Sequence, residues 1–493
     1  MCAEVEERFP RASGTMIIAC LLALSVFSAP GVVPFVEANS EEARGQNLVV
    51  LLIDGYGSAL FNRTNERVQY GMRSLMAQGT HAQYMRPVFP TQSYPNWRSL
   101  MTGLFTENHK FTSDFMYDEK WGITYERDEG PNDTDYRWWM GGPSPIWYTA
   151  GKHEINVHCY WFPECHKPHE DMIVQVPPAR RHSFASNNMN RDLFEEVASV
   201  MKHIKRYQNQ KQQLVLMRHG GIATALQTFG ADHEAVNQAI STADVQVRKI
   251  QEEMESLNLF ETTNLIVLSD FGLLPIDTEE QFFVDECLED FSRVKRVVNS
   301  LSFMMVYPKE GEEDTVYFEL KVCDQWAPLG DYDADEVPLV NVYRKADIPE
   351  RLHWKMGPHI APIVLITRPG TVLLTRQIPS TDVSEKHGRE YKAIGGWDSD
   401  QTEMKAIFAA RGPAFKVDHS IGPIESVDVY QLMCNILGVE PSHSHNGTWE
   451  NVEEMLVEGW ENRKVEPHVS AAPVGTRSLL SSLLLMCLSM FLL

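Results

Sequence analysis

Four continuous apolar runs, rich in branched side chains, stand out along the chain at residues 48–53, 214–217, 265–268 and 363–366. An uninterrupted apolar run of this length is typical of a strand that is buried on both faces, as in a parallel sheet covered by helices. We therefore expect all four runs to be strands of one parallel sheet.

A helical pattern lies between the second and third runs. From residue 236 to residue 257, apolar side chains recur at steps of three and four residues, which places them on one face of a helix. Asp232 is a candidate N-cap for this helix. Strands that alternate with helices predict an α/β fold with a doubly wound, mostly parallel sheet flanked by helices, in a single large domain over residues 45–455.

Two acidic residues follow strands of the predicted sheet. Asp54 comes directly after the first run, and Asp270 follows the third by two positions. In a sheet of this kind, functional side chains lie at the carboxyl ends of the strands. Two carboxylates at that edge are what an enzyme of cation-assisted phosphoryl or sulfuryl transfer needs.

Composition and net charge limit the kinds of fold and of binding partner that we expect. The chain has 493 residues, of which 43% are apolar, and 67 acidic residues against 44 basic ones give a formal net charge of −23. The apolar fraction predicts a globular fold. A surface this acidic repels a phosphate backbone, so we do not expect the protein to bind a nucleic-acid duplex.

Both ends of the chain carry apolar segments. The apolar run 16–27 follows Arg8 and Arg11, which predicts a signal peptide within residues 1–38, or alternatively an uncleaved membrane anchor. Small residues at 470–472, a short spacer and the apolar tail 479–493 resemble a GPI-attachment signal, with a C-terminal membrane helix as the alternative. We expect residues 456–470 to form a stalk, residues 471–493 to be removed, and the protein to be anchored on the extracellular side of the cell membrane.

Three sequons are consistent with that location. Asn62, Asn132 and Asn446 each precede a threonine by two positions, with no proline between them. This pattern is the acceptor for N-glycosylation in secreted proteins. We therefore predict a glycoprotein.

Five cysteines lie outside the predicted cleaved ends: Cys159, Cys165, Cys287, Cys323 and Cys434. Disulfides persist in an extracellular compartment, and Cys159 and Cys165 are close enough in sequence to close a small loop. Five is an odd number, so Cys434 either links two chains, in a homodimer or with a homologue, or is a buried free thiol.

Several motifs resemble, in order along the chain, those of the nucleotide pyrophosphatase/phosphodiesterase family of the alkaline phosphatase superfamily. They lie at residues 53–56, 88–96, 100–104, 266–272 and 404–416. Within this family the chain is most similar to the GPI-anchored, choline-specific glycerophosphodiesterase. The resemblance implies an alkaline phosphatase-like fold and a site where two zinc ions, held by three aspartates and three histidines, activate a serine or threonine nucleophile.

The resemblance also assigns roles to individual residues. It implies that Asp54 and Asp270 are retained metal ligands, that Ser93 is the nucleophile and that Asn96 is the asparagine beside it. The remaining four ligand positions have lost the aspartate or histidine of the family. They are Ala223, Gln227, Phe271 and Gly395.

Nearby histidines do not match the lost ligand positions, and His387 could reach the site only if the loop between it and Gly395 rearranged. His219, His233 and His387 lie in the same stretches, but none has the spacing of the family motif. We interpret the chain as a pseudoenzyme that acts by binding. The alternative is a residual metal-dependent phosphodiesterase or pyrophosphatase on nucleotide or choline phosphodiesters, with Ser93 as nucleophile and at most one divalent cation held weakly by Asp54, Ser93 and Asp270.

Overall fold

The computed structural model describes residues 45–64, 69–126, 135–139, 141–162, 164–165, 189–276, 281–323, 338–377 and 391–460. The predicted signal peptide and GPI-attachment signal lie outside these ranges, as do Asn132 and His387. Within these ranges, no helix is long and apolar enough to cross a membrane.

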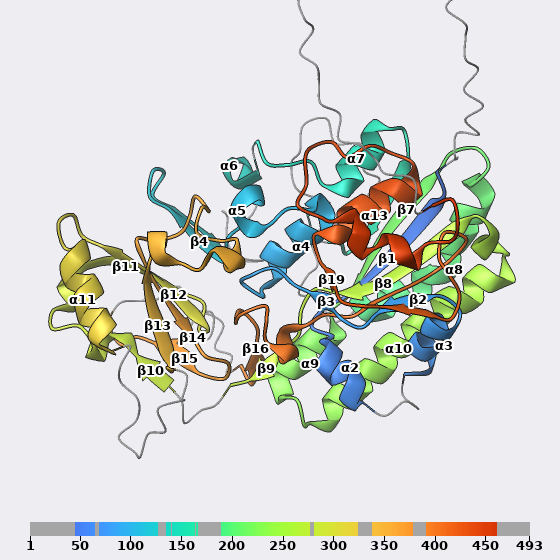
Figure 1. Ribbon diagram of the computed structural model, residues 1–493. Helices are drawn as coiled ribbons and strands as arrows, with labels where there is room; N and C mark the ends of the chain where they lie inside the picture. Colours follow the sequence, from blue (N-terminus) through green and yellow to red (C-terminus); the bar gives the residue numbers. More distant parts are fainter. Residues whose placement is uncertain are drawn as a thin grey trace, which may run out of the picture. The chain divides into compact units, whose positions relative to one another are not determined.

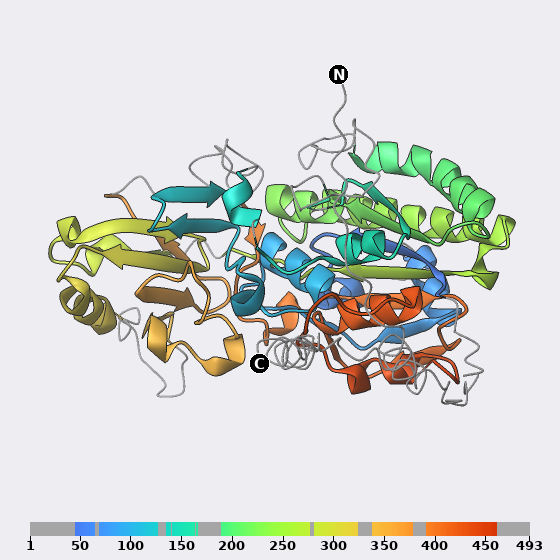
Figure 2. The ribbon, with the colours of Figure 1, turned by 90° about the horizontal axis from the view of Figure 1, so that it is seen from above.

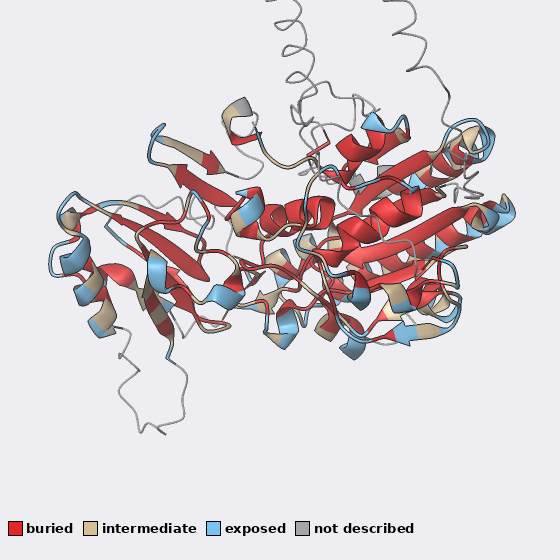
Figure 3. Cartoon of the chain, turned by 45° about the horizontal axis from the view of Figure 1, so that its top comes forward, coloured by how far each residue is buried: buried red, intermediate tan, exposed pale blue. Residues whose placement is uncertain are grey.

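The central sheet of the described residues has seven strands in the order β18-β2-β17-β8-β1-β7-β6. In its middle, β1 pairs in parallel with both β7 and β8, and β17 is antiparallel to its two neighbours. Every residue of β1, β7 and β8 is buried, which explains their continuous apolar sequences (Figure 3). The seven strands are β1 (Asn47–Ile53), β2 (Thr80–Ala82), β6 (Asn156–Tyr160), β7 (Gln213–His219), β8 (Thr263–Ser269), β17 (Phe408–Arg411) and β18 (His419–Ile421).

Helices cover both faces of this sheet (Figures 1 and 2). Alternate residues of β1 divide between the two sides, with Leu48 in one core cluster and Val49 in the other. One cluster contains α4 (Ser93–Thr102), α7 (Ile146–Lys152) and α13 (Asp428–Leu437), and the other contains α3 (Tyr70–Ala77), α8 (Met189–Tyr207), α9 (Gly221–Phe229) and α10 (Glu234–Ser256). The predicted doubly wound α/β fold is therefore confirmed.

The helix α10 matches the predicted helical pattern, but its N-cap differs from the prediction. The side chain of His233 accepts a hydrogen bond from the backbone amide of Ala235 at 3.1 Å. The N-cap is therefore His233, and the prediction of Asp232 was wrong by one residue.

A second sheet of four antiparallel strands contains the fourth apolar run. Its order is β11-β12-β14-β13, and residues 363–366 lie in β14, so their assignment to the parallel sheet was wrong. Val364 and Leu365 belong to core clusters on opposite faces of this sheet. Because β14 is buried on both faces, its apolar pattern is the same as that of a parallel strand. The strands are β11 (Val294–Asn299), β12 (Phe303–Pro308), β13 (Val340–Arg344) and β14 (Ile363–Thr367).

Shorter elements complete the described part of the chain. The helices are α2 (Ser58–Arg63), α5 (Thr106–His109), α6 (Tyr136–Trp139) and α11 (Glu313–Cys323), and the strands are β3 (Met85–Arg86), β4 (Phe115–Asp118), β5 (Ile123–Glu126), β9 (Leu274–Pro275), β10 (Gln281–Phe283), β15 (Val372–Leu374), β16 (Ala393–Ile394) and β19 (Ile424–Glu425).

The structure also bears on the predicted disulfides and on the predicted start of the stalk at residue 456. Cys159 and Cys165 form the predicted disulfide. Cys434 on α13 is a free thiol that is fully buried, so a disulfide between chains through it would require α13 to open. Leu456 and Trp460, at the start of the predicted stalk, are buried in the core, so the folded chain continues to at least Trp460.

Candidate functional site

A buried ion pair lies where the central strands β1 and β7 end. Asp54 follows β1, Arg218 is the penultimate residue of β7, and they are 4% and 7% exposed. The Nε atom of Arg218 donates to Oδ2 of Asp54 at 2.6 Å, and Nη2 makes a second contact with the same oxygen. The guanidinium lies 4.7 Å from the centre of the Trp97 ring. The carboxylate at the first implied ligand position is therefore paired with a cation of the chain itself.

Asp270, the second retained carboxylate, is fully buried directly after β8 and accepts three hydrogen bonds. The donors are the backbone amides of Gly55 and Phe271 and the indole Nε1 of Trp97, each at 2.9 Å. Burial raises the pKa of Asp270 to about 7, and repulsion from Asp54 adds to this effect. Both carboxylates that the resemblance implied as metal ligands thus have protein partners.

Ser93 is the first residue of α4, where a carboxylate meets the helix. Asp114, which is 4% exposed, accepts hydrogen bonds from the backbone amides of Tyr94 at 2.8 Å and Ser93 at 3.4 Å. The amides at a helix N-terminus form a natural binding site for an anion such as phosphate. Here the carboxylate of Asp114 binds these amides.

Asn96 lies on α4, one turn after Ser93. Its side chain is fully buried, accepts from the amide of Val88 at 2.8 Å and donates to the carbonyls of Pro90 and Gln92 at 3.1 and 2.9 Å. All of these partners belong to the loop that leads into α4. The contacts therefore give Asn96 the role of holding this loop.

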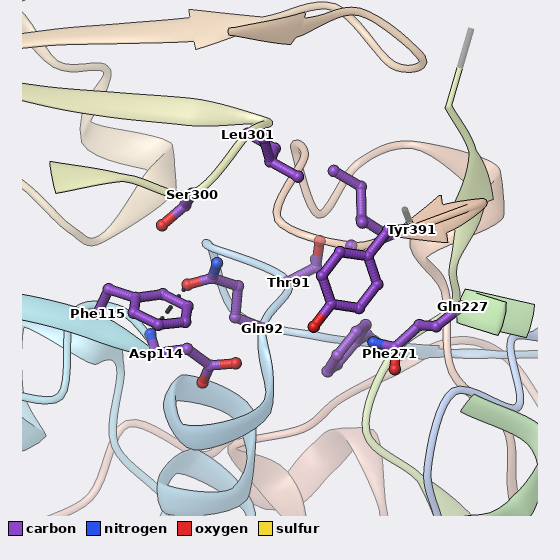
Figure 4. A pocket seen from close by; sticks show the side chains of 11 residues that line it. Thr91, Gln92, Asp114, Phe115, Gln227, Phe271, Ser300, Leu301 and Tyr391 are labelled. Atoms are coloured by element: carbon purple, nitrogen blue, oxygen red, sulfur yellow. Dashed lines mark hydrogen bonds between the residues drawn. The ribbon is translucent and has the colours of Figure 1, made fainter. Parts of the chain in front are cut away.

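The four positions at which the resemblance implies lost ligands lie near residues already described. Ala223 in the first turn of α9 donates its amide to the carbonyl of Asp54 at 3.2 Å. Gln227, Phe271 and Gly395 line one pocket of about 60 Å³, which Asp114 also lines (Figure 4). The register assigned from the sequence thus brings these positions together in space.

This pocket has no room for a large ligand or for a side chain at position 395. Pockets for small organic ligands usually measure ~300–1,000 Å³, and this one is several times smaller. A Cβ atom on Gly395 would lie 2.7 Å from the Phe271 ring and 2.3 Å from the carbonyl oxygen of Thr91. The ring of Phe271 therefore occupies space that a histidine at position 395 would need.

The available donors do not fit two zinc ions. In the part of the chain that the structure describes, no group of three or more histidine, cysteine or acidic side chains is placed to hold a metal. His219 is buried, which lowers its pKa to about 4, and the Nδ1 atom of His233 accepts the capping bond of α10. His387 lies outside the described residues.

Sequence reasoning missed Arg218, Trp97 and Asp114. A signal existed for two of them. Arg218 directly follows the second apolar run and must lie at the same sheet edge as Asp54, and Trp97 is four residues after Ser93, on the same face of the helix. Asp114 had no such signal, because its approach to α4 depends on the path of the loop before β4.

Comparisons with known proteins identify similar chains. Residues 48–391 match the family described as "Type I phosphodiesterase / nucleotide pyrophosphatase". The chain is 26% identical to ectonucleotide pyrophosphatase/phosphodiesterase family member 7 of Rattus norvegicus, over 83% of this chain and 88% of the relative. It is also 26% identical to the bis(5'-adenosyl)-triphosphatase ENPP4 of Bos taurus, over 89% and 88%. The solved structure of human ENPP5 matches with a TM-score of 0.71 and 25% identity, over 83% of this chain and 100% of that one.

Proposed function

Because the chain belongs to the type I phosphodiesterase/nucleotide pyrophosphatase family, we propose that it is a non-catalytic, extracellular member that acts by binding. The observation that carries this proposal is that protein groups contact both carboxylates that the resemblance implies as metal ligands. Arg218 pairs with Asp54, and Trp97 donates to Asp270.

The charge of Arg218 opposes a divalent cation at this position. A divalent cation at about 5 Å from the Arg218 guanidinium would be repelled by on the order of 6 kcal/mol at an effective dielectric constant of ~20. Moving Arg218 away would leave a buried guanidinium without its carboxylate. A metal ion bound by Asp54 must therefore either tolerate the repulsion from Arg218 or break the ion pair between Arg218 and Asp54.

The loss of a metal has a large effect on the rate of phosphodiester hydrolysis. A zinc ion activates the nucleophile and stabilises the charge of the transition state, and it supplies several kcal/mol. Each ~1.4 kcal/mol corresponds to a tenfold change in rate. Without either zinc ion, this activation of the nucleophile is lost.

The phosphate side of the site supports the same proposal. Asp114 binds the amides at the start of α4 and also lines the adjacent pocket, so a phosphate group there would meet a negative charge. The pocket of about 60 Å³ is also too small for a nucleotide. The ligand of this protein therefore binds elsewhere on its surface.

The extracellular location rests on independent features. The predicted signal peptide, the sequons and the Cys159–Cys165 disulfide all suit the secretory pathway, since disulfides are rare in the cytosol. The C-terminal sequence supports anchoring by GPI. The choline-specific branch and a dimer through Cys434 stay predictions.

Residual catalysis with one metal is the second candidate. Its support is the survival of Asp54, Ser93 and Asp270, whose oxygens suit a hard divalent cation. In this case, the substrates would be nucleotide or choline phosphodiesters, as the resemblance implies.

Turnover of a chromogenic phosphodiester decides between the two candidates. The secreted protein is assayed with and without added Zn²⁺, and Ser93→Ala is the matched variant. We expect zinc to give no hydrolysis above the level of Ser93→Ala. Zinc-dependent turnover that is lost in Ser93→Ala would establish the catalytic alternative instead.

A further inference from the structure

A second, larger pocket lies beside α2. Its volume of about 440 Å³ is within the usual range of ~300–1,000 Å³ for pockets that hold small organic ligands. Its walls come from α2, from the segment 83–86 and from the segment 400–405. None of its lining residues belongs to the site described above.

Three charged side chains of this pocket have partners within the chain. Lys405, only 7% exposed, donates to the carbonyl of Ser399 at 2.7 Å, and its Nζ atom lies 5.2 Å from the centre of the Tyr84 ring. Arg86 pairs with Asp400 at 2.8 Å. An aromatic ring among fixed donors and acceptors is a surface that suits a saccharide, because sugar hydroxyls hydrogen-bond while C–H groups contact the ring.

An acceptor for a saccharide lies in the wall of this pocket. Asn62 of the sequon Asn62-Arg63-Thr64 is exposed on α2 and lines the pocket together with Tyr84 and Lys405. We propose that an N-linked glycan on Asn62 folds back into this pocket, where its first sugar residues contact Tyr84, Gln83 and Arg86. The inference rests on passage through the secretory pathway, and not on the loss of catalysis.

The chemistry of attachment is that of any sequon. A lipid pyrophosphate-linked oligosaccharide supplies the sugar, Nδ2 of Asn62 forms a bond to its anomeric carbon, the lipid pyrophosphate leaves and the amide loses one proton. Once attached, the glycan reaches the pocket without a second molecular encounter. A short tether gives effective concentrations in the ~mM range, so weak saccharide contacts are sufficient to fill the pocket.

Asn446 provides a matched control in the same chain. It is exposed, and its Oδ1 atom accepts from the amide of Phe105 at 3.0 Å, which leaves Nδ2 available for a glycan. Peptide N-glycosidase cleaves the bond between asparagine and the first sugar, so it needs access to the part of the glycan that the pocket would cover. Release from each asparagine is followed by mass spectrometry, in the native and in the denatured protein.

We expect release from Asn62 in the native protein to be at least tenfold slower than from Asn446, and the two rates to become equal after denaturation. Tyr84→Ala, which removes one wall of the pocket, should speed release from Asn62 and leave Asn446 unchanged. The thermal unfolding midpoint reports whether this variant is folded, and the comparison within the wild type holds without it.

Three results would overturn the inference. The first is equal release from Asn62 and Asn446 in the native protein. The second is a glycan on Asn446 with none on Asn62. The third is a secreted protein with neither site modified, which would leave both the proposed secretory route and the proposed loss of catalysis untouched.

Discussion

The Arg218 guanidinium supplies the positive charge that Asp54 needs in the folded protein. The two side chains are 7% and 4% exposed, so neither is well hydrated. Trp97 lies against this guanidinium and donates to Asp270, which links the two carboxylates through protein groups. Asp54 and Asp270 thus have a structural role in this fold.

Removal of Arg218 should be costly because it leaves the Asp54 charge buried. We expect Arg218→Ala to lower the free energy of unfolding by about 3–5 kcal/mol, measured by urea denaturation. Arg248→Ala, which breaks an exposed pair with Glu252, should change it by no more than ~0.5 kcal/mol. If Arg218→Ala lowers the free energy of unfolding no more than this control, the ion pair with Arg218 does not stabilise the buried charge of Asp54.

His359 gives a second prediction, on pH dependence. Burial lowers its pKa to about 4, while Asp118 acts in the opposite direction and Lys345 and Lys110 lower it further. Between this value and the unfolded value of 6.5, the unfolded chain binds more protons, so stability falls as the pH decreases. From pH 7 to pH 5 the contribution is on the order of 1–2 kcal/mol.

The contribution of His359 is tested by measuring the midpoint of urea unfolding between pH 7 and pH 5. His359→Gln cannot gain a proton, so its stability should fall less steeply between pH 7 and pH 5 than that of the wild type. Parallel curves for the two proteins would show that His359 is not kept neutral by the fold.

At the scale of elements, the strand ends and the loops between them determine what the site can hold. The segment at Gly395 follows β16, packs against the Thr91 carbonyl and leaves no space beside the Phe271 ring. A histidine restored at position 395 therefore requires movement of two separate segments. The absence of a side chain at position 395 therefore goes together with the close packing of Thr91 and Phe271 around it.

Gly395→Ala tests that coupling. Because the added methyl group meets both Thr91 and Phe271, we expect a loss of about 1–3 kcal/mol in unfolding free energy. Phe271→Ala in the same chain should not restore stability, since the Thr91 carbonyl is backbone. Gly422→Ala is the control, because nothing lies within 4 Å of its added methyl group. Equal stability of the two alanine variants would mean that position 395 has room for a side chain.

The sequence predicted where the strands lie better than it predicted the sheet to which each strand belongs. The runs 48–53, 214–217 and 265–268 became adjacent parallel strands, whereas 363–366 has the same pattern in an antiparallel sheet. Burial on both faces produces one pattern in either setting. The edge with Asp54 and Asp270 was also predictable, because the carboxyl ends of parallel strands meet there.

What the sequence did not reveal is which groups complete the site. Arg218 and Asp114 contact the retained residues through the tertiary arrangement of β7, α4 and the loop before β4. Counting missing ligands predicts a weak metal site, but it does not show that other side chains occupy the contacts. That distinction depends on distances between segments far apart in the chain.

At the scale of the whole molecule, the chain has the fold of the phosphodiesterase family, and charged groups of the chain itself contact the residues that the resemblance implies as metal ligands and nucleophile. Arg218 pairs with one carboxylate, and Asp114 binds the helix amides that an anion would contact. The full sequence carries a formal net charge of −23, which disfavours polyanions as partners. These features together support the proposal of a binding protein built on an enzyme scaffold.

The measurement that tests this account most directly is the zinc content of the secreted protein. Wild type and Asp54→Asn are equilibrated with zinc, desalted and analysed by elemental mass spectrometry. The account predicts far less than one zinc ion per chain, with no difference between the two proteins. One or two zinc ions per chain in the wild type, lost in Asp54→Asn, would contradict it.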